Sequence, residues 1–220
     1  FTNYQFFKSS KFEGFKTRIL PNIPILETKL PEPIIQYLWG LIKIAEDKPE
    51  NLKDGLAGNI SKSSKLVDTQ KLFNKFCIPT LQEVDNTMGK SWHTLNSGKS
   101  FRYDLTHLWV NYQRQTEFNP QHDHGGAYSF VVWMKIPTSN KEQRELPIAK
   151  ESLNGDSISN FSFSYTDILG NIRNAAWIME KETAGTMVMF PSRLKHQVYP
   201  FYECDEERIS IAGNFGVMYE

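Results

Sequence analysis

The chain has 220 residues, and its 25 Lys and Arg residues balance its 25 Asp and Glu residues, so the formal net charge is zero. This length fits one large domain with a substantial core. The balanced charge argues against a basic surface that follows the phosphates of a nucleic acid. No apolar run is long enough to span a bilayer, and we find no signal-peptide pattern. Cys77 and Cys204 lie far apart in unrelated contexts, which favours two reduced thiols and a cytoplasmic location.

The first hundred residues carry two helical patterns. Residues 30–45 place apolar side chains at helical spacing, with a proline near the start. Residues 68–88 form a second candidate, in which Pro79 is expected to kink or split the helix. A polar stretch with Pro and Gly separates the two and reads as a loop. We therefore expect residues 1–100 to be a helical support that packs on the rest of the chain.

From residue 101 to residue 220 the sequence is typical of a β domain, because short runs of aromatic and β-branched residues alternate with Gly, Pro, Asn and Asp. The predicted strands are residues 105–112, 129–136, 160–165, 175–179, 185–190, 196–199 and 208–215. Many short strands after two helices argue against a parallel α/β sheet and favour a sandwich or closed barrel with a helical support. Residues 138–156 are polar and long for a loop, so we expect a mobile flap near a site.

Three histidines form the most informative pattern in the sequence. His122 and His124 lie in the segment Asn-Pro-Gln-His-Asp-His-Gly-Gly, and His196 follows a remote predicted strand. Residues i and i+2 of an extended strand point to the same side, so His122 and His124 can converge on one point. A third ligand from a distant strand would close one face of a metal ion and leave the other open. That geometry suits chemistry more than structural support.

These motifs resemble the iron(II)- and 2-oxoglutarate-dependent oxygenase superfamily. The segments that carry the likeness are residues 119–126, 190–196 and 208–214, in that order, within a match over about residues 101–217. The chain is most similar to a small, mostly uncharacterised branch found in phage and marine bacterial genomes. The resemblance implies a double-stranded β-helix, which is a cupin-like jelly roll, and a site for Fe(II), 2-oxoglutarate and O2.

The resemblance also implies roles for individual residues. His122 and His196 are expected to bind iron. Arg208, which lies 12 positions after His196, is expected to anchor the distal carboxylate of 2-oxoglutarate, because its planar fork can bind two oxygens at once. Ser210 projects to the same face and would assist this anchor. Tyr112 resembles the tyrosine that contacts 2-oxoglutarate in some family members.

The third metal ligand departs from the commonest family pattern, in which an Asp or Glu stands two residues after the first histidine. Strand phase puts His124 at that position, which implies a three-histidine site with Asp123 facing away. An irregular strand at Gly125 and Gly126 would instead let Asp123 ligate the metal, and the sequence leaves both readings open. Weaker candidates for the pocket are Asn111, Trp133 and Lys135.

We therefore expect a non-haem iron(II) dioxygenase that converts 2-oxoglutarate to succinate and CO2 and hydroxylates its substrate. Two other classes stay open. One is a cupin-like dioxygenase or isomerase that uses the metal without 2-oxoglutarate. The other is a non-catalytic jelly-roll binding protein whose histidines pack or hold a structural metal. The substrate can be a small molecule or a protein side chain; we expect no nucleic acid or membrane partner, and a homodimer is compatible with the sequence.

Overall fold

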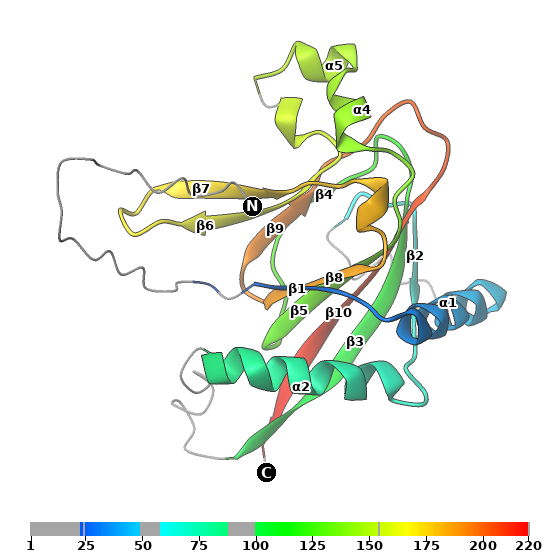
Figure 1. Ribbon diagram of the computed structural model, residues 1–220, viewed down its shortest axis with the longest axis vertical. Coiled ribbons are helices and arrows are strands. Elements are labelled where there is room, and N and C mark those ends of the chain that lie inside the picture. The colour runs from blue at the N-terminus through cyan, green and yellow to red at the C-terminus, as the bar shows by residue number, and fades with distance from the viewer. Residues whose placement is uncertain (1–22, 24, 49–57, 88–99, 154, 220) are drawn as a thin grey trace.

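Two antiparallel sheets make up most of the computed structural model, which describes residues 23, 25–48, 58–87, 100–153 and 155–219. The six strands of the first sheet are, in spatial order, β1 (Leu26–Lys29), β8 (Thr186–Pro191), β5 (Tyr128–Lys135), β10 (Arg208–Tyr219), β3 (Phe101–Gln113) and β2 (Lys62–Lys65). The four strands of the second sheet are β4 (Asn119–His122), β9 (Lys195–Val198), β6 (Phe161–Thr166) and β7 (Ile172–Trp177). Figure 1 shows the second sheet lying over one face of the first. The expected mainly β fold with N-terminal helices is confirmed.

Each of the seven predicted strands is present, with ends shifted by a few residues. The strands that the sequence pattern missed are β1, β2 and β4, each of four residues. Such short segments, for example Lys-Ser-Ser-Lys in β2, carry too little apolar alternation to be recognised. Because β1 and β2 lie within the first hundred residues, that part of the chain extends the barrel as well as supporting it.

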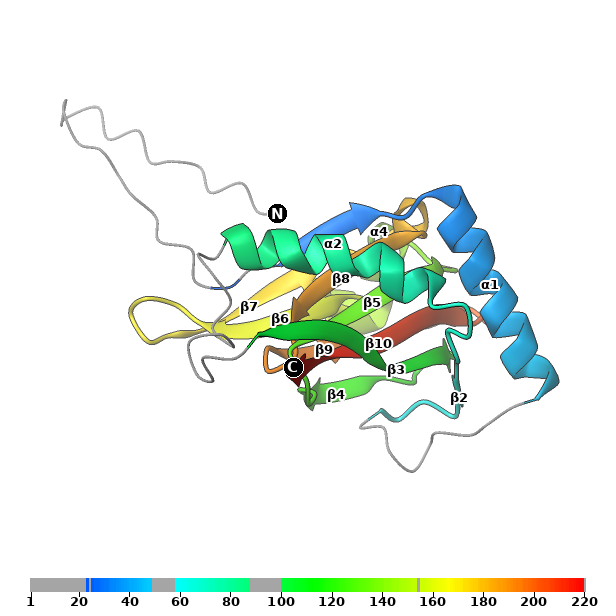
Figure 2. The same ribbon diagram turned by 90° about the horizontal axis from the view of Figure 1, so that it is seen from below.

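Two long helices cover the outer face of the six-stranded sheet (Figure 2). They are α1 (Glu32–Asp47) and α2 (Leu72–Thr87), close to the predicted ranges. Helix α2 runs through Pro79 without being split, and the proline ring is exposed on the side away from the sheet. The buried side of α2 includes Phe73 and Leu81, which join one apolar cluster with α1 and the sheet. None of the described helices is long and apolar enough to cross a membrane.

The six-stranded sheet is buried on both faces, and alternate residues of its strands separate the two sides. On β10, Ile211 packs in the cluster beneath the helices, whereas Ser210 and Ala212 line a pocket on the opposite face. A second apolar cluster, which includes Trp133 and Phe161, fills part of the space between the two sheets. Strand phase therefore decides which side chains reach the pocket, since a shift by one residue moves a side chain to the other face of the sheet.

The described part of residues 138–156 is largely helical rather than the loop that the sequence predicted, while its mobility stays a prediction. They form the short helices α4 (Asn140–Arg144) and α5 (Pro147–Lys150), followed by the 3-10 turn η2 (Gly155–Ser157). Ser139 and Glu142 make a capping box that starts α4, with each side chain accepting from the other's backbone N–H. Polar side chains that indicated a loop thus accept hydrogen bonds from the free backbone N–H groups at the start of a helix. A second 3-10 turn, η3 (Lys181–Thr183), precedes β8.

Candidate active site

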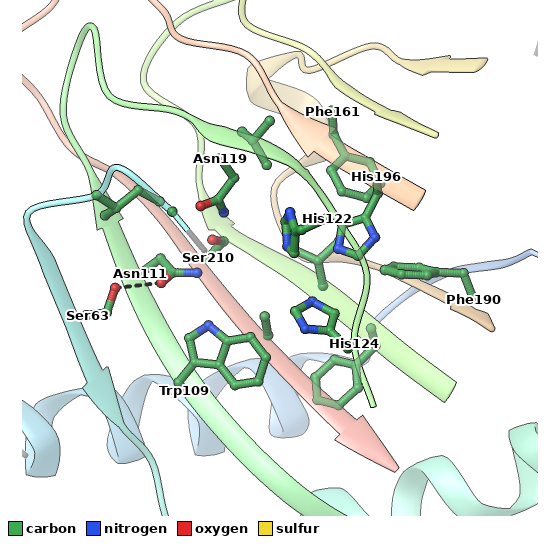
Figure 3. Close-up of a pocket in the computed structure, with 16 residues that line it drawn as sticks. Ser63, Trp109, Asn111, Asn119, His122, His124, Phe161, Phe190, His196 and Ser210 are labelled. Atoms are coloured by element: carbon green, nitrogen blue, oxygen red, sulfur yellow. Dashed lines mark hydrogen bonds between the residues drawn. The ribbon is translucent and has the colours of Figure 1, made fainter. Parts of the chain in front are cut away.

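The three histidines meet at one end of the space between the sheets. His122 at the end of β4 and His196 on β9 are direct cross-strand partners. His124 lies two residues beyond β4, where its backbone N–H donates to the carbonyl of Ser192 at 2.9 Å. One nitrogen from each ring lies within 4.8 Å of the others, and Figure 3 shows the rings turned toward a common point. The expected convergence of His122, His124 and His196 is therefore present in the structure.

Backbone carbonyls fix which nitrogen of two of these rings faces the centre. Nδ1 of His122 lies 2.7 Å from the carbonyl oxygen of Pro120, and Nδ1 of His196 lies 2.9 Å from that of Leu194. A carbonyl can only accept, so Nδ1 carries the proton and Nε2 keeps its lone pair. Rings oriented in this way present Nε2 as a metal ligand.

Burial keeps the three imidazoles uncharged. Desolvation is the main cause that lowers the pKa of His196 to about 3 and that of His124 to about 4, and it also lowers the pKa of His122. Mutual repulsion between the rings adds to the shift of His124 and His196. At neutral pH each ring therefore has a free lone pair, which is the form that binds a metal ion.

Asp123 does not join this group. Its carboxylate accepts from Lys195 at 2.7 Å and lies 3.7 Å from Arg193, and these contacts lower its pKa. Within the described residues, the cluster that can hold a metal consists of the three histidines alone. Of the two readings left open by the sequence, this geometry favours a three-histidine site with Asp123 turned away.

A pocket opens beside the triad and is lined by neutral side chains (Figure 3). Asn111 and Ser63 face it from β3 and β2, and the Ser63 hydroxyl donates to Oδ1 of Asn111 at 2.7 Å. This bond leaves the Nδ2 donors of Asn111 for the pocket. Trp109 packs edge-on to the His124 ring, with centroids 5.7 Å apart. Sequence reasoning missed Ser63 because strand β2 was not predicted, and no signal singled out Trp109 or Asn119, which also line the pocket.

Arg208 begins β10 on the same face as Ser210 and is fully buried. Its Nη2 donates to the carbonyl of Ser159 at 2.9 Å and to the hydroxyl at 2.5 Å, and its Nη1 donates to Oε1 of Gln113 at 3.3 Å. Its Nε has no hydrogen-bond partner. No carboxylate pairs with this guanidinium in the described part of the chain, and burial alone lowers the pKa of Arg208 to about 9. At neutral pH it is thus a buried cation without an anion.

Three other residues that the sequence suggested for the pocket, Tyr112, Trp133 and Lys135, do not line it. Tyr112 pairs in register with Ile209, so it faces the helices and joins the apolar cluster beneath them. The structure therefore does not bring Tyr112 to the pocket, because it has the opposite strand phase from Asn111. Trp133 packs in the inner apolar cluster, and Lys135 forms a half-exposed ion pair with Glu206 at 2.7 Å.

One known protein family matches the part of the chain that carries the three histidines and Arg208. A family model described as "Putative 2OG-Fe(II) oxygenase" matches residues 107–214. This segment contains the three histidines and Arg208. The resemblance to the superfamily is thereby confirmed, while the narrower likeness to a phage and marine bacterial branch stays a prediction. No curated protein matches the chain.

Solved structures confirm the fold. A prolyl-4-hydroxylase from Pseudomonas putida is 14% identical, with a TM-score of 0.50 over 87% of this chain and 91% of that chain. A prolyl hydroxylase from Trichoplax adhaerens, solved with a hypoxia inducible factor peptide, is 12% identical, with a TM-score of 0.50 over 90% and 82%. The epimerase SnoN of nogalamycin biosynthesis is 12% identical, with a TM-score of 0.53 over 89% and 80%. At these identities the likeness shows the double-stranded β-helix fold.

The residues present fit the metal and co-substrate after which the family is named. Three neutral imidazoles on one side of a common point suit iron(II) and leave coordination positions for other ligands. The Nε of buried Arg208 has no hydrogen-bond partner, so it suits an acceptor, and a carboxylate of 2-oxoglutarate would supply one. Iron(II) and 2-oxoglutarate are therefore groups that these residues would fit.

Proposed function

We propose that the protein is an iron(II)- and 2-oxoglutarate-dependent dioxygenase that hydroxylates a C–H bond of its substrate. In this reaction 2-oxoglutarate, O2 and the substrate yield succinate, CO2 and the hydroxylated product. One oxygen atom of O2 enters succinate and the other enters the product. Bound iron supplies the activation of O2 that this chemistry requires.

The observation that carries the proposal is the state of Arg208. A fully buried guanidinium that has no carboxylate partner in the described part of the chain is costly unless a ligand supplies the anion. Arg208 does not itself line the pocket, but Ser210, two residues further along β10 and on the same face of the strand, lines it together with the three histidines. The distal carboxylate of a 2-oxo dicarboxylic acid would thus meet Arg208 and Ser210 while its other end lies toward the histidines.

The remaining residues orient these groups. Nδ1–H bonds to the carbonyls of Pro120 and Leu194 hold the rings of His122 and His196 in the ligand tautomer. The amide of Asn111, braced by Ser63, adds a neutral donor in the same pocket. Aromatic side chains of Trp109, Phe161 and Phe190 form apolar walls that limit the access of water.

Succinate formation tests the proposal. The iron-loaded wild-type protein is incubated with 2-oxoglutarate and O2 across a substrate panel, and succinate is measured by NMR against an Arg208→Ala control. We expect succinate from the wild type and a loss of at least about a hundredfold in Arg208→Ala, because two charge-assisted hydrogen bonds are removed. Equal succinate from both proteins would remove the assigned role of Arg208, and no succinate from either would overturn the proposal.

Product analysis separates hydroxylation from other outcomes. The similar structures include enzymes named prolyl hydroxylases and one named an epimerase, so the same fold supports different products. We expect the product to gain one oxygen atom from O2. When the reaction is run with isotopically labelled O2, mass spectrometry should find one labelled oxygen atom in the product. A product of unchanged mass, formed with succinate, would replace hydroxylation by a rearrangement such as epimerisation.

A further inference from the structure

Ser159 makes the closest contacts to the buried guanidinium of Arg208. Both its carbonyl and its hydroxyl accept from the same nitrogen, Nη2, at 2.9 and 2.5 Å. On another side, Gln113 accepts from Nη1 at 3.3 Å, and the ring of Phe201 lies 5.0 Å from the guanidinium carbon. Three of the five N–H donors of Arg208 are thus used by uncharged groups, which leaves the Nε–H and one Nη1–H for a ligand.

The backbone at Ser159 is unusual. Its φ is 63°, in the left-handed region that non-glycine residues seldom adopt, and its exposed fraction is 0%. The N–H of Ser159 donates to the carbonyl of Pro200 at 2.9 Å. A buried residue keeps such a conformation when its surroundings fix it, and here the conformation points two oxygens at one nitrogen.

Ser159 connects Arg208 to a separate part of the chain, the helical segment of residues 139–157. The side chain of Asn140 at the start of α4 donates to the carbonyl of Ile158 at 2.8 Å. Gln143 exchanges two hydrogen bonds of 2.8 Å with the backbone of Tyr202, next to Phe201. These bonds connect the helical segment to the chain at two points beside Arg208, one next to Ser159 and one next to Phe201.

We propose that Ser159 is a positioning residue for Arg208 and that it couples the helical segment to the binding of a dicarboxylate there. The inference rests on the proposed function, because it takes 2-oxoglutarate as the ligand of Arg208. Ser159 fixes the orientation of the guanidinium, so the two unused donors meet the carboxylate without rearrangement. Coupling between sites is reciprocal, so ligand binding at Arg208 stabilises the helical segment in return.

Two substitutions at one position test the positioning role. Affinity for 2-oxoglutarate is measured by calorimetry on iron-loaded protein without oxygen, and thermal unfolding is measured for each variant. Ser159→Ala removes the hydroxyl and is expected to weaken binding about five- to twentyfold. Ser159→Asp places a carboxylate beside Arg208, so it is expected to weaken binding further while the unfolding temperature stays at or above the wild-type value. Ser162→Ala is the matched control, since Ser162 is a buried serine that accepts one hydrogen bond, from Gln197.

The two variants separate positioning from a purely structural role, in which affinity would follow stability. A Ser159→Asp protein as stable as the wild type that binds 2-oxoglutarate equally well overturns the inference. So does a folded Ser159→Ala protein that loses no more affinity than the control. If the wild type itself binds no 2-oxoglutarate, the proposed function fails as well, which distinguishes the two failures.

Hydrogen exchange of the wild-type protein tests the coupling without any variant. Amides of residues 139–160 are compared with and without 2-oxoglutarate in the iron-loaded protein. We expect slower exchange in this segment when the ligand is bound, and little change in α1, on the outer face of the six-stranded sheet, as an internal reference. Equal exchange of residues 139–160 in both states, at ligand concentrations that saturate the site, contradicts the coupling.

Discussion

Asp123 and Lys195 form an ion pair of 2.7 Å that turns the Asp123 carboxylate away from the metal pocket. Each residue is the sequence neighbour of a histidine in the triad. The pair therefore links the end of β4 to β9 at the level where His122 and His196 face each other. It is partly exposed, so its own contribution to stability is small, but it holds the Asp123 carboxylate outside the cluster of the three histidines.

Metal affinity should respond differently to the two candidates for the third ligand. We expect His124→Ala to weaken iron(II) binding by about tenfold or more, because it removes a direct ligand. Asp123→Asn keeps the three imidazoles and should change the affinity by no more than about fivefold. Both are measured by competition with a chromophoric chelator in the absence of oxygen.

The opposite ranking of these two variants would assign the third position to Asp123. His107→Ala serves as the control, because His107 is an exposed histidine bonded to the neighbouring Thr106 hydroxyl, outside the metal cluster. Iron affinity of this variant should equal that of the wild type.

Strand phase predicts a contrast between Ser210 and Tyr112 in co-substrate binding. Ser210→Ala removes a hydroxyl that faces the pocket, so the KM for 2-oxoglutarate should rise by about three- to tenfold. Tyr112→Phe alters a side chain on the helix-facing side and should leave this KM unchanged. Steady-state succinate assays check both values. A raised KM in Tyr112→Phe would show that the tyrosine reaches the co-substrate after all.

The two cysteines should differ in reactivity. Cys77 is fully buried in α2, and burial strongly raises the pKa of its thiol, whereas Cys204 is partly exposed. Iodoacetamide reacts with thiolates, so we expect mass spectrometry to find label on Cys204 alone in the folded protein and on both cysteines after unfolding. Fast labelling of Cys77 under native conditions would contradict the buried packing of α2.

The turn between β6 and β7 carries a carboxylate with a lowered pKa. A hydrogen bond from Arg173 and others from the backbone and side chain around Asn171 lower the pKa of Asp167 from 3.8 to about 2. The pKa of Asp167 is lower in the folded protein than in the unfolded chain, so the ionised carboxylate stabilises the folded state. This stabilisation is present above about pH 4 and is lost as the pH falls toward 2. NMR titration of the Asp167 carboxyl carbon measures this directly. A midpoint near 3.8 would show that the turn does not hold the carboxylate.

The sequence was sufficient to predict the residues whose chemistry is distinctive. His122, His124 and His196 stand out by type and spacing, and Arg208 follows them at a characteristic interval. Their convergence agrees with that reading because β4 and β9 pair at His122 and His196, and His124 follows two residues beyond β4. The side to which Tyr112 points was harder to predict, since β3 is buried on both faces over its second half.

Residues whose role depends on remote packing were not predictable. Ser63 lies on a four-residue strand without apolar alternation, and its partner Asn111 is 48 positions away. Ser159 owes its place to a left-handed backbone between the predicted loop of residues 138–156 and the predicted strand of residues 160–165. In both cases an ordinary serine gains its importance from the side chain it meets, which spacing along the chain does not reveal.

The short strand β2 makes the first hundred residues part of the pocket. Ser63 braces Asn111 from that strand, and α1 and α2 cover the apolar outer face of the six-stranded sheet. A truncated protein that starts at residue 101 would lose one wall of the pocket. It would also expose to solvent the apolar face of the sheet that α1 and α2 cover. Such a fragment is therefore a poor starting point for expression, and fusion partners are better attached ahead of β1 than between α2 and β3.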